Sequence, residues 1–187
     1  MSVKRRTRQI LEELADYAEY LNDEQLAALS DAILNAHHIF TAGAGRTGVM
    51  VRGFTNRLMH LGFSVSMVGE ITSPHSSEGD LLIIGSGSGE TGSLKALAEK
   101  TVDRGVKLAL VTMDGQSSIA RMSDITVVLP GVSPKTKHAE NRITSIQPMG
   151  SAFEQMCLLT FDGLVLELME RTAQDSGTMF ARHADFE

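Results

Sequence analysis

The 187-residue sequence contains one cysteine, no tryptophan and four prolines. The single thiol, Cys157, excludes an internal disulfide, and we expect a reduced, cytoplasmic setting in which it is a small buried hydrophobe rather than a nucleophile. The longest apolar run, 156–169, is interrupted by Asp162 and Glu167 and is too short to span a bilayer. Basic residues near the N-terminus are followed at once by acidic ones, so no targeting signal is expected.

Positive charge is also scarce, because 17 Lys and Arg stand against 23 Asp and Glu, which gives a formal charge of −6. This balance repels polyanions and anionic membranes, so we expect neither nucleic acid nor a membrane as a partner. An anionic small molecule would have to be bound by local donors. The length and the 42% hydrophobic share predict a single domain over 1–187 with a sizeable core.

Apolar spacing predicts two helices in 1–36, over 4–21 and from an Asn22 cap to Asn35. Strands and helices then alternate across 37–130. Strands are expected at 39–42, 63–68, 80–85, 106–113 and 125–129, and helices at 47–61, 93–104 and 117–122. This alternation predicts an α/β fold of the flavodoxin-like kind, a three-layer sandwich with a five-stranded parallel sheet and helices on both faces.

Residues 131–147 are polar and lack a clean period, so we expect a loop over the site. Its basic residues receive no assigned role: Lys135, Lys137, His138 and Arg142. Pro148 is expected to start a long helix that continues to about Gln174. A short tail, 177–187, then closes the chain, so 148–187 forms the last part of the single domain.

Two turns rich in glycine and hydroxyl groups, Gly43–Gly48 and Ser86–Gly92, each follow an apolar run and open a helical stretch. A strand that ends in a tight glycine turn leaves backbone N–H groups at a helix N-terminus, where they and the helix dipole favour an anion. Ser86, Ser88 and Thr91 add neutral donors. The two turns together predict a site for a phosphorylated small molecule; the simpler alternative is two tight βα turns without a ligand.

A dinucleotide site is the main rival interpretation. The first turn also reads G-x-G-x-x-G, and Glu70 ends the next strand about where a ribose-binding acid lies in a dinucleotide fold. Against this alternative, the second turn carries three hydroxyl groups and the rest of the chain offers no domain for hydride transfer. Glu70 stays open between a substrate role and that of a solvated or interface residue.

Several stretches resemble the sugar isomerase (SIS) domain family, and the resemblance covers nearly the whole chain. The stretches are 39–46, 57–60, 68–70, 79–81, 84–91, 146–151, 153–155, 179–180 and 183–184. The serine-glycine turn at 84–91 is typical of the whole family. Gln147–Ser151 and the His183-Ala184 tail indicate its branch of hexulose phosphate isomerases.

The resemblance implies interconversion of D-arabino-hex-3-ulose 6-phosphate and fructose 6-phosphate, the isomerising step after formaldehyde is fixed onto ribulose 5-phosphate. It also implies a five-stranded parallel sheet between helices, a homotetramer, and no metal or redox cofactor. Two alternatives remain open at this point. One is a non-catalytic module that binds sugar phosphates, and the other is an isomerase of a related pentose or heptose phosphate.

Moving a carbonyl from C3 to C2 requires a base, a route for the oxygen proton and stabilisation of an enediolate. A carboxylate in a partly dehydrated pocket becomes a stronger base, which suits a glutamate to removing a carbon-bound proton. Glu154, near the start of the helix expected after Pro148, is the predicted base. Its simpler alternative is an ordinary acidic residue favoured by the helix dipole.

Arg46, just beyond Gly45 in the first helical turn, is predicted to polarise the carbonyl or orient the enediolate; the alternative is a structural salt bridge. The phosphate is predicted to lie against the second turn. The residues assigned to substrate binding are Gly45, Ser86, Gly87, Ser88, Gly89 and Thr91.

Among the six histidines, only His183 matches a family position in the C-terminal tail. The resemblance implies that it acts as an acid/base on the substrate oxygens, including across a subunit interface. Taken alone, a tail histidine more often docks or frays. His60 is expected to be a packing or interface residue.

Overall fold

The computed structural model describes residues 2–134 and 144–185. Its centre is a parallel sheet of five strands in the order β2-β1-β3-β4-β5. The strands are β1 Ile39–Gly43, β2 Val65–Met67, β3 Leu81–Gly85, β4 Lys107–Thr112 and β5 Ile125–Val128. This 2-1-3-4-5 order is the flavodoxin-like arrangement and differs from the 3-2-1-4-5-6 order of dinucleotide-binding folds. The predicted α/β class is confirmed.

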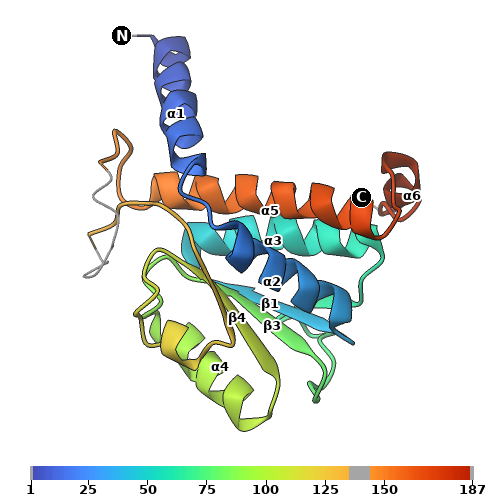
Figure 1. Cartoon of the computed structure of the whole chain (residues 1–187). Helices are drawn as coiled ribbons and strands as arrows, with labels where there is room; N and C mark the ends of the chain where they lie inside the picture. The colour runs from blue at the N-terminus through green and yellow to red at the C-terminus, as the bar shows by residue number, and fades with distance from the viewer. Residues whose placement is uncertain (1, 135–143, 186–187) are drawn as a thin grey trace.

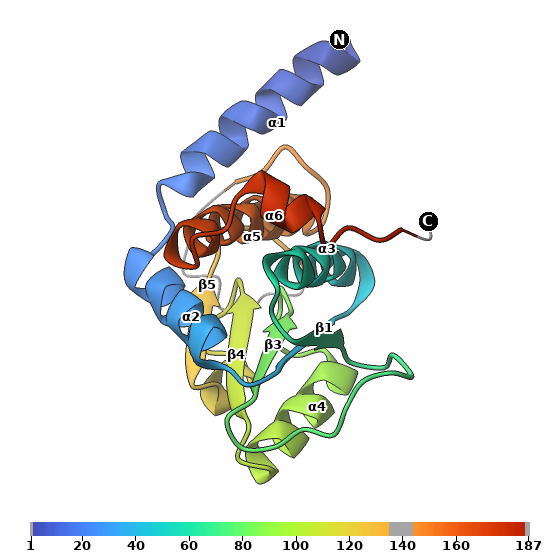
Figure 2. The ribbon, with the colours of Figure 1, turned by 90° about the vertical axis from the view of Figure 1, so that its right-hand side faces the viewer.

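Helices cover both faces of this sheet, so the sandwich has three layers (Figure 2). Alternate strand residues face opposite sides, as the period of a strand requires. Ile39 and Ile83 pack into the core beneath α2, α3 and α5, whereas Phe40 and Ile84 pack into the core beneath α4. The helices are α1 Val3–Ala18, α2 Asp23–Asn35, α3 Gly45–Leu61, α4 Gly92–Asp103, α5 Ser151–Arg171 and α6 Ser176–Phe180, with a short 3-10 helix at Ala120–Met122.

Helices α3 and α5 lie side by side and run in the same direction (Figure 1). Their first turns meet through Arg46 and Glu154, and their middle turns meet through the stacked rings of Phe54 and Phe161, whose centroids are 4.4 Å apart. The N-termini of both helices therefore lie at the same edge of the sheet. This edge is the carboxyl end of the strands, because α3 directly follows β1.

The third glycine of the first turn allows α3 to approach β1 closely. A Cβ built on Gly48 would lie 2.8 Å from the carbonyl oxygen of Gly43, and one built on Gly43 would lie 2.9 Å from Cα of Gly48. Both contacts are with backbone atoms, which cannot turn aside as a side chain can. The G-x-G-x-x-G spacing thus has a packing function in this fold.

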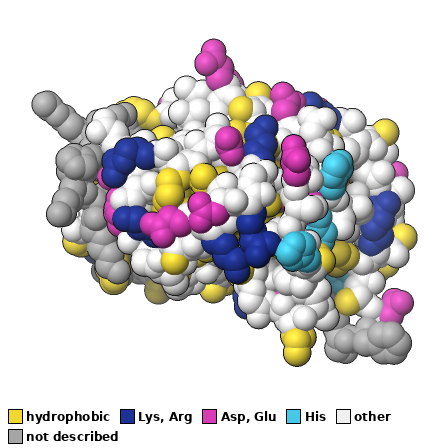
Figure 3. Space-filling model, turned by 90° about the horizontal axis from the view of Figure 1, so that it is seen from below, with side chains coloured by type: hydrophobic (Ala, Val, Ile, Leu, Met, Phe, Trp, Pro, Cys, Tyr) yellow, Lys and Arg dark blue, Asp and Glu magenta, His cyan; other side chains and the backbone are white. Residues whose placement is uncertain are grey.

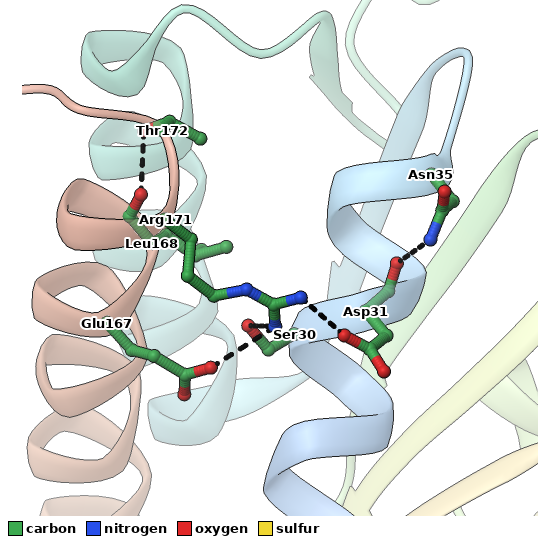
Figure 4. Close-up of polar contacts among 7 residues, drawn as sticks. All are labelled: Ser30, Asp31, Asn35, Glu167, Leu168, Arg171 and Thr172. Atoms are coloured by element: carbon green, nitrogen blue, oxygen red, sulfur yellow. Dashed lines mark hydrogen bonds and ion pairs between the residues drawn. The ribbon is translucent and has the colours of Figure 1, made fainter.

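The C-terminal end of α5 is tied to α2 by Arg171 (Figure 4). One guanidinium nitrogen, Nη2, lies 2.6 Å from Oδ1 of Asp31. A second nitrogen, Nη1, donates to Ser30 Oγ at 3.0 Å and to Glu167 Oε1 at 3.3 Å. These contacts fix the far end of the helix whose first turn carries Glu154.

Two expectations for the C-terminal part are wrong in detail. Helix α5 begins at Ser151 rather than at Pro148, because Met149 has a positive φ of 57° and Gly150 is the non-helical cap. The tail is partly folded, since Ser176–Phe180 forms α6. The Asp175 carboxylate caps this helix by accepting the Thr178 N–H at 2.7 Å.

Helix α1 extends away from the rest of the molecule (Figures 1 and 2). Its last turns pack through Leu14 and Tyr17 against Ala152 and Met156 of α5.

No helix in the described part of the chain is long and apolar enough to cross a membrane. On the face below α4, basic, acidic and histidine side chains lie next to one another (Figure 3).

Candidate active site

The two glycine turns begin side by side at the topological switch of the sheet. Gly43 at the end of β1 pairs with Gly85 at the end of β3. Beyond these residues the chain turns in opposite directions, because α3 packs on one face of the sheet and α4 on the other. In open parallel sheets this divergence creates the crevice in which ligands bind.

A hollow of about 1600 Å³, including its open mouth, occupies this crevice. The positive ends of the α3 and α5 dipoles point toward it, and Thr91, the N-cap of α4, lies on its wall. The lining residues are Ala44, Gly45, Arg46, Thr47, Gly87, Ser88, Thr91, Met113, Ser133, Pro134, Met149, Gly150, Ser151, Phe153 and Glu154. The arrangement favours an anionic ligand without a large net positive charge.

The second turn presents only part of its expected donor set to the hollow. Gly87, Ser88 and Thr91 line the hollow. Ser86 is buried behind them, with its Oγ 3.4 Å from Thr91 Oγ1. Gly89 is buried too, and its N–H donates to the Ser86 carbonyl at 3.1 Å, so this amide serves the turn itself.

Close packing around the turn leaves little room for a side chain at Gly87. A Cβ at this position would lie 2.8 Å from Met113 Cε and 3.1 Å from the ring of Phe153. The backbone is held from the other side as well, because the Gly87 carbonyl accepts the Met113 N–H at 3.0 Å. The turn is therefore held against β4 by a backbone hydrogen bond and by side-chain packing.

Arg46 and Glu154 meet at the wall of the hollow. Arg46 Nη1 lies 2.8 Å from Glu154 Oε2 and donates to Ser151 Oγ at 2.9 Å. The Glu154 side chain is 18% exposed and that of Arg46 is 49% exposed. The structure thus brings together two of the three predicted catalytic residues, with the carboxylate held in one orientation by its ion pair.

Cys157 lies one turn beyond Glu154 but does not reach the hollow, because its side chain is fully buried. Burial raises the pKa of the thiol, and the nearby charge of Glu154 raises it further. A thiol that stays protonated is a poor nucleophile. The expectation that Cys157 is a buried hydrophobe is confirmed.

His183 lies at the opposite end of α3 from Arg46. Its ring stacks on His60, with centroids 5.4 Å apart, next to a hollow that Arg57 and Phe180 also line. The 17 residues of α3 separate the two ends by about 25 Å. Within one chain, His183 is therefore remote from Glu154.

Other residues considered from the sequence also lie away from the hollow. Glu70 is exposed beyond β2 and is not among the lining residues. Lys135, Lys137, His138 and Arg142 lie outside the described residues. On the near side of that segment, Ser133 and Pro134 line the hollow, as expected for a loop next to the site.

Sequence reasoning gave no role to Ser151, the hydroxyl that accepts from Arg46. Ser151 belongs to the Gln147–Ser151 stretch that resembles the family, but the stretch does not indicate its partner. The contact joins residues 105 positions apart and has no local sequence signal. Among the described residues, no three His, Cys, Asp or Glu side chains lie close enough together to hold a metal ion.

The family model described as the SIS domain matches residues 32–159. The chain belongs to the SIS family. A relative named 3-hexulose-6-phosphate isomerase, from Bacillus subtilis, is 48% identical over 96% of both chains. One with the same name from Mycobacterium gastri is 35% identical over 95% of this chain and 88% of its own.

Solved structures agree with this family assignment. A crystal structure from Methanococcus jannaschii, whose molecular function was inferred to be that of a 3-hexulose-6-phosphate isomerase, superposes with a TM-score of 0.83. It is 30% identical, and the match covers 98% of this chain and 99% of the other. The likeness therefore extends beyond the matched SIS segment to the helices at both ends.

Proposed function

We propose that this chain isomerises D-arabino-hex-3-ulose 6-phosphate to fructose 6-phosphate, the step that follows formaldehyde fixation in the ribulose monophosphate pathway. The observation that carries the proposal is the Arg46–Glu154 pair on the wall of a hollow lined by the two glycine turns. The named activity of relatives at 48% and 35% identity supports the choice of substrate.

The phosphate is assigned to the second turn and the helix N-termini. Ser88 and Thr91 supply hydroxyl donors, and Gly87 lets the backbone approach the ligand. Gly45 and the first turn of α3 face the same hollow. Helix N-termini attract a phosphate through their N–H groups and dipoles, which matters in a chain of net charge −6. This binding lies away from the reacting carbons and anchors the substrate.

Glu154 is assigned as the base. It removes the proton from C2, the electron pair forms a C2–C3 double bond, and the C3 carbonyl oxygen becomes the enediolate oxygen. The proton on the C2 hydroxyl is then lost as that oxygen becomes the new carbonyl, and C3 receives a proton. The oxygen at C3 also gains one, so the atoms balance without an external oxidant.

Arg46 is assigned to orient the carboxylate and to stabilise the enediolate. Its Nη1 already holds Glu154 and Ser151, while half of the side chain stays exposed to the hollow. A planar guanidinium offers further N–H groups to the substrate oxygens without releasing the glutamate. The shift of hydrogen between carbons is redox-neutral, so we assign no redox cofactor.

His183 is assigned as the acid/base for the substrate oxygens, acting from a neighbouring subunit of a homotetramer. The distance along α3 supports this arrangement, because His183 cannot serve the hollow of its own chain. Large apolar side chains exposed on α5 and α6 support subunit contacts: Leu158, Leu166 and Phe180. We place the enzyme in the cytoplasm, as its single cysteine suggests.

The direct test is incubation of the purified protein with D-arabino-hex-3-ulose 6-phosphate and identification of the product by NMR. Arabinose 5-phosphate and sedoheptulose 7-phosphate serve as comparison substrates. The proposal expects fructose 6-phosphate as the product and much slower conversion of the other two. Faster conversion of the pentose or heptose phosphate would identify that sugar phosphate as the substrate instead. Binding without conversion would indicate a non-catalytic sensor.

A further inference from the structure

The segment that leads into α5 is held by α1 as well as by its own neighbours. Among the described residues, Glu13 of α1 accepts three hydrogen bonds from this segment. Oε1 accepts from Ser145 Oγ at 2.5 Å and from Gln147 Nε2 at 3.2 Å, and Oε2 accepts from the Ile146 N–H at 2.9 Å. Each bond has a charged acceptor, which makes it stronger than a neutral one.

Two further contacts stabilise the same junction. Ser145 Oγ accepts the Gln147 N–H at 3.0 Å, and the Tyr17 hydroxyl donates to the Thr144 carbonyl at 3.3 Å. The junction thus joins two parts of the chain more than 125 positions apart. Gln147 is one of the residues that mark the hexulose phosphate branch, yet its amide is engaged with Glu13 rather than with the hollow.

Only three residues separate this junction from Ser151. Pro148 has a fixed φ, Met149 adopts a left-handed conformation with φ 57°, and Gly150 caps α5. Ser151 then accepts from Arg46, and the Glu154 N–H donates to the Gly150 carbonyl. A displacement of the junction would therefore move the first turn of α5, which carries the assigned base.

We infer that Glu13 is a positioning residue for the reaction: it fixes residues 145–147 and thereby sets where Ser151 and Glu154 lie relative to Arg46. This inference rests on the proposed function. Helix α1, most of which extends away from the body, thus contributes to the active site through this side chain (Figure 1). Misplacing a catalytic group by about 1 Å is enough to cost about 100-fold in rate.

The test compares Glu13→Ala and Glu13→Gln with Glu12→Ala, a matched control on the exposed side of the same helix. We expect Glu13→Ala to lower kcat at least 10-fold with KM changed less than threefold, because the phosphate contacts are untouched. Glu13→Gln keeps one acceptor oxygen, so its kcat should lie between those of wild type and Glu13→Ala. Glu12→Ala should match wild type. Thermal melts must show each variant folded at the assay temperature.

Hydrogen exchange gives a readout that is independent of turnover. Glu13→Ala should speed exchange of the Ile146, Ser151 and Glu154 amides, each of which donates a hydrogen bond, while exchange in the C-terminal half of α5 stays as in wild type. An unchanged kcat, or unchanged exchange at Ser151 and Glu154, would overturn the inference. If wild type and Glu12→Ala both fail to convert the hexulose phosphate, the proposed function fails, and exchange at Ser151 and Glu154 alone then decides whether Glu13 positions this turn.

Discussion

Replacing Glu154 with glutamine removes the base and leaves the shape of the site intact. Glutamine retains an acceptor oxygen for Arg46 Nη1, which lies 2.8 Å from the present carboxylate. Because the Arg46 side chain is 49% exposed, water can solvate it when its charged partner is lost. We expect the free energy of unfolding to fall by at most about 1 kcal/mol, which lowers Tm by no more than about 2–4 °C.

The chemical effect should be much larger than the structural one. A positioned general base contributes about 100-fold to 10,000-fold to a rate. We expect kcat to fall about 1000-fold, which corresponds to about 4 kcal/mol in the barrier. KM should change less than about threefold, since the assigned phosphate donors lie on the second turn.

The assay follows fructose 6-phosphate formation with a coupled NADPH readout and varies the hexulose phosphate concentration. Glu170→Gln, on an exposed site of the same helix, is the matched control and should behave as wild type. A Glu154→Gln variant that keeps more than a tenth of wild-type kcat would refute the assignment of the base. A loss of folded protein in the melt would show that the drop has another origin.

Four other outcomes test the remaining parts of the account. Ser88→Ala should raise KM severalfold and leave kcat within twofold; an unchanged KM would place the phosphate elsewhere. Gly48→Ala should lower stability by about 1–3 kcal/mol in a thermal melt, because its Cβ would meet the Gly43 backbone, whereas Gly53→Ala has open space and should hold or raise Tm. Mixed oligomers refolded from Glu154→Gln and His183→Ala chains should regain about one quarter of wild-type activity if each site takes its histidine from a neighbour; no recovery contradicts that arrangement. The hydrogen bond from the Thr178 N–H lowers the pKa of the Asp175 carboxyl. The cap therefore stabilises α6 fully above the ordinary pKa of an aspartate, and this stabilisation is lost as the pH falls through the lowered pKa. Protection factors of the α6 amides should drop below about pH 4, and protection factors that do not change with pH would contradict this.

The sheet and the two glycine turns could be predicted from sequence because their signals are local. Each strand is a short apolar run, and Gly43–Gly48 and Ser86–Gly92 mark the turns that follow β1 and β3. The close approach of Gly48 to Gly43 is a consequence of that same motif. The strand order β2-β1-β3-β4-β5 is that of the predicted flavodoxin-like fold, although no local signal in the sequence specifies which strands are neighbours.

The start of α5 was predicted wrongly because the backbone conformation of one residue could not be predicted from its type. Pro148 is a common first residue of a helix, but Met149 takes a left-handed conformation and delays the start to Ser151. The short helix in the tail depends on the Asp175 cap. The spacing of hydrophobic residues, from which the other helices were predicted, does not indicate such a cap.

The contacts that orient the site were beyond sequence reasoning for a different reason. Arg46 meets Ser151 and Glu154 across more than 100 positions, and Glu13 meets Ser145 across 132. Such pairs have no spacing rule, since they arise from the way α1, α3 and α5 pack. Residue types suitable for the chemistry were identifiable, whereas their partners required the structure.

The central claim is that Glu154 moves hydrogen between C2 and C3 of an anchored ketose phosphate. Its most direct test is incubation of the protein with fructose 6-phosphate in deuterated water, followed by NMR. The account predicts deuterium at C3 of fructose 6-phosphate with wild type and almost none with Glu154→Gln. Deuterium at C1, or neither deuterium incorporation nor hexulose phosphate formation with wild type, would contradict it.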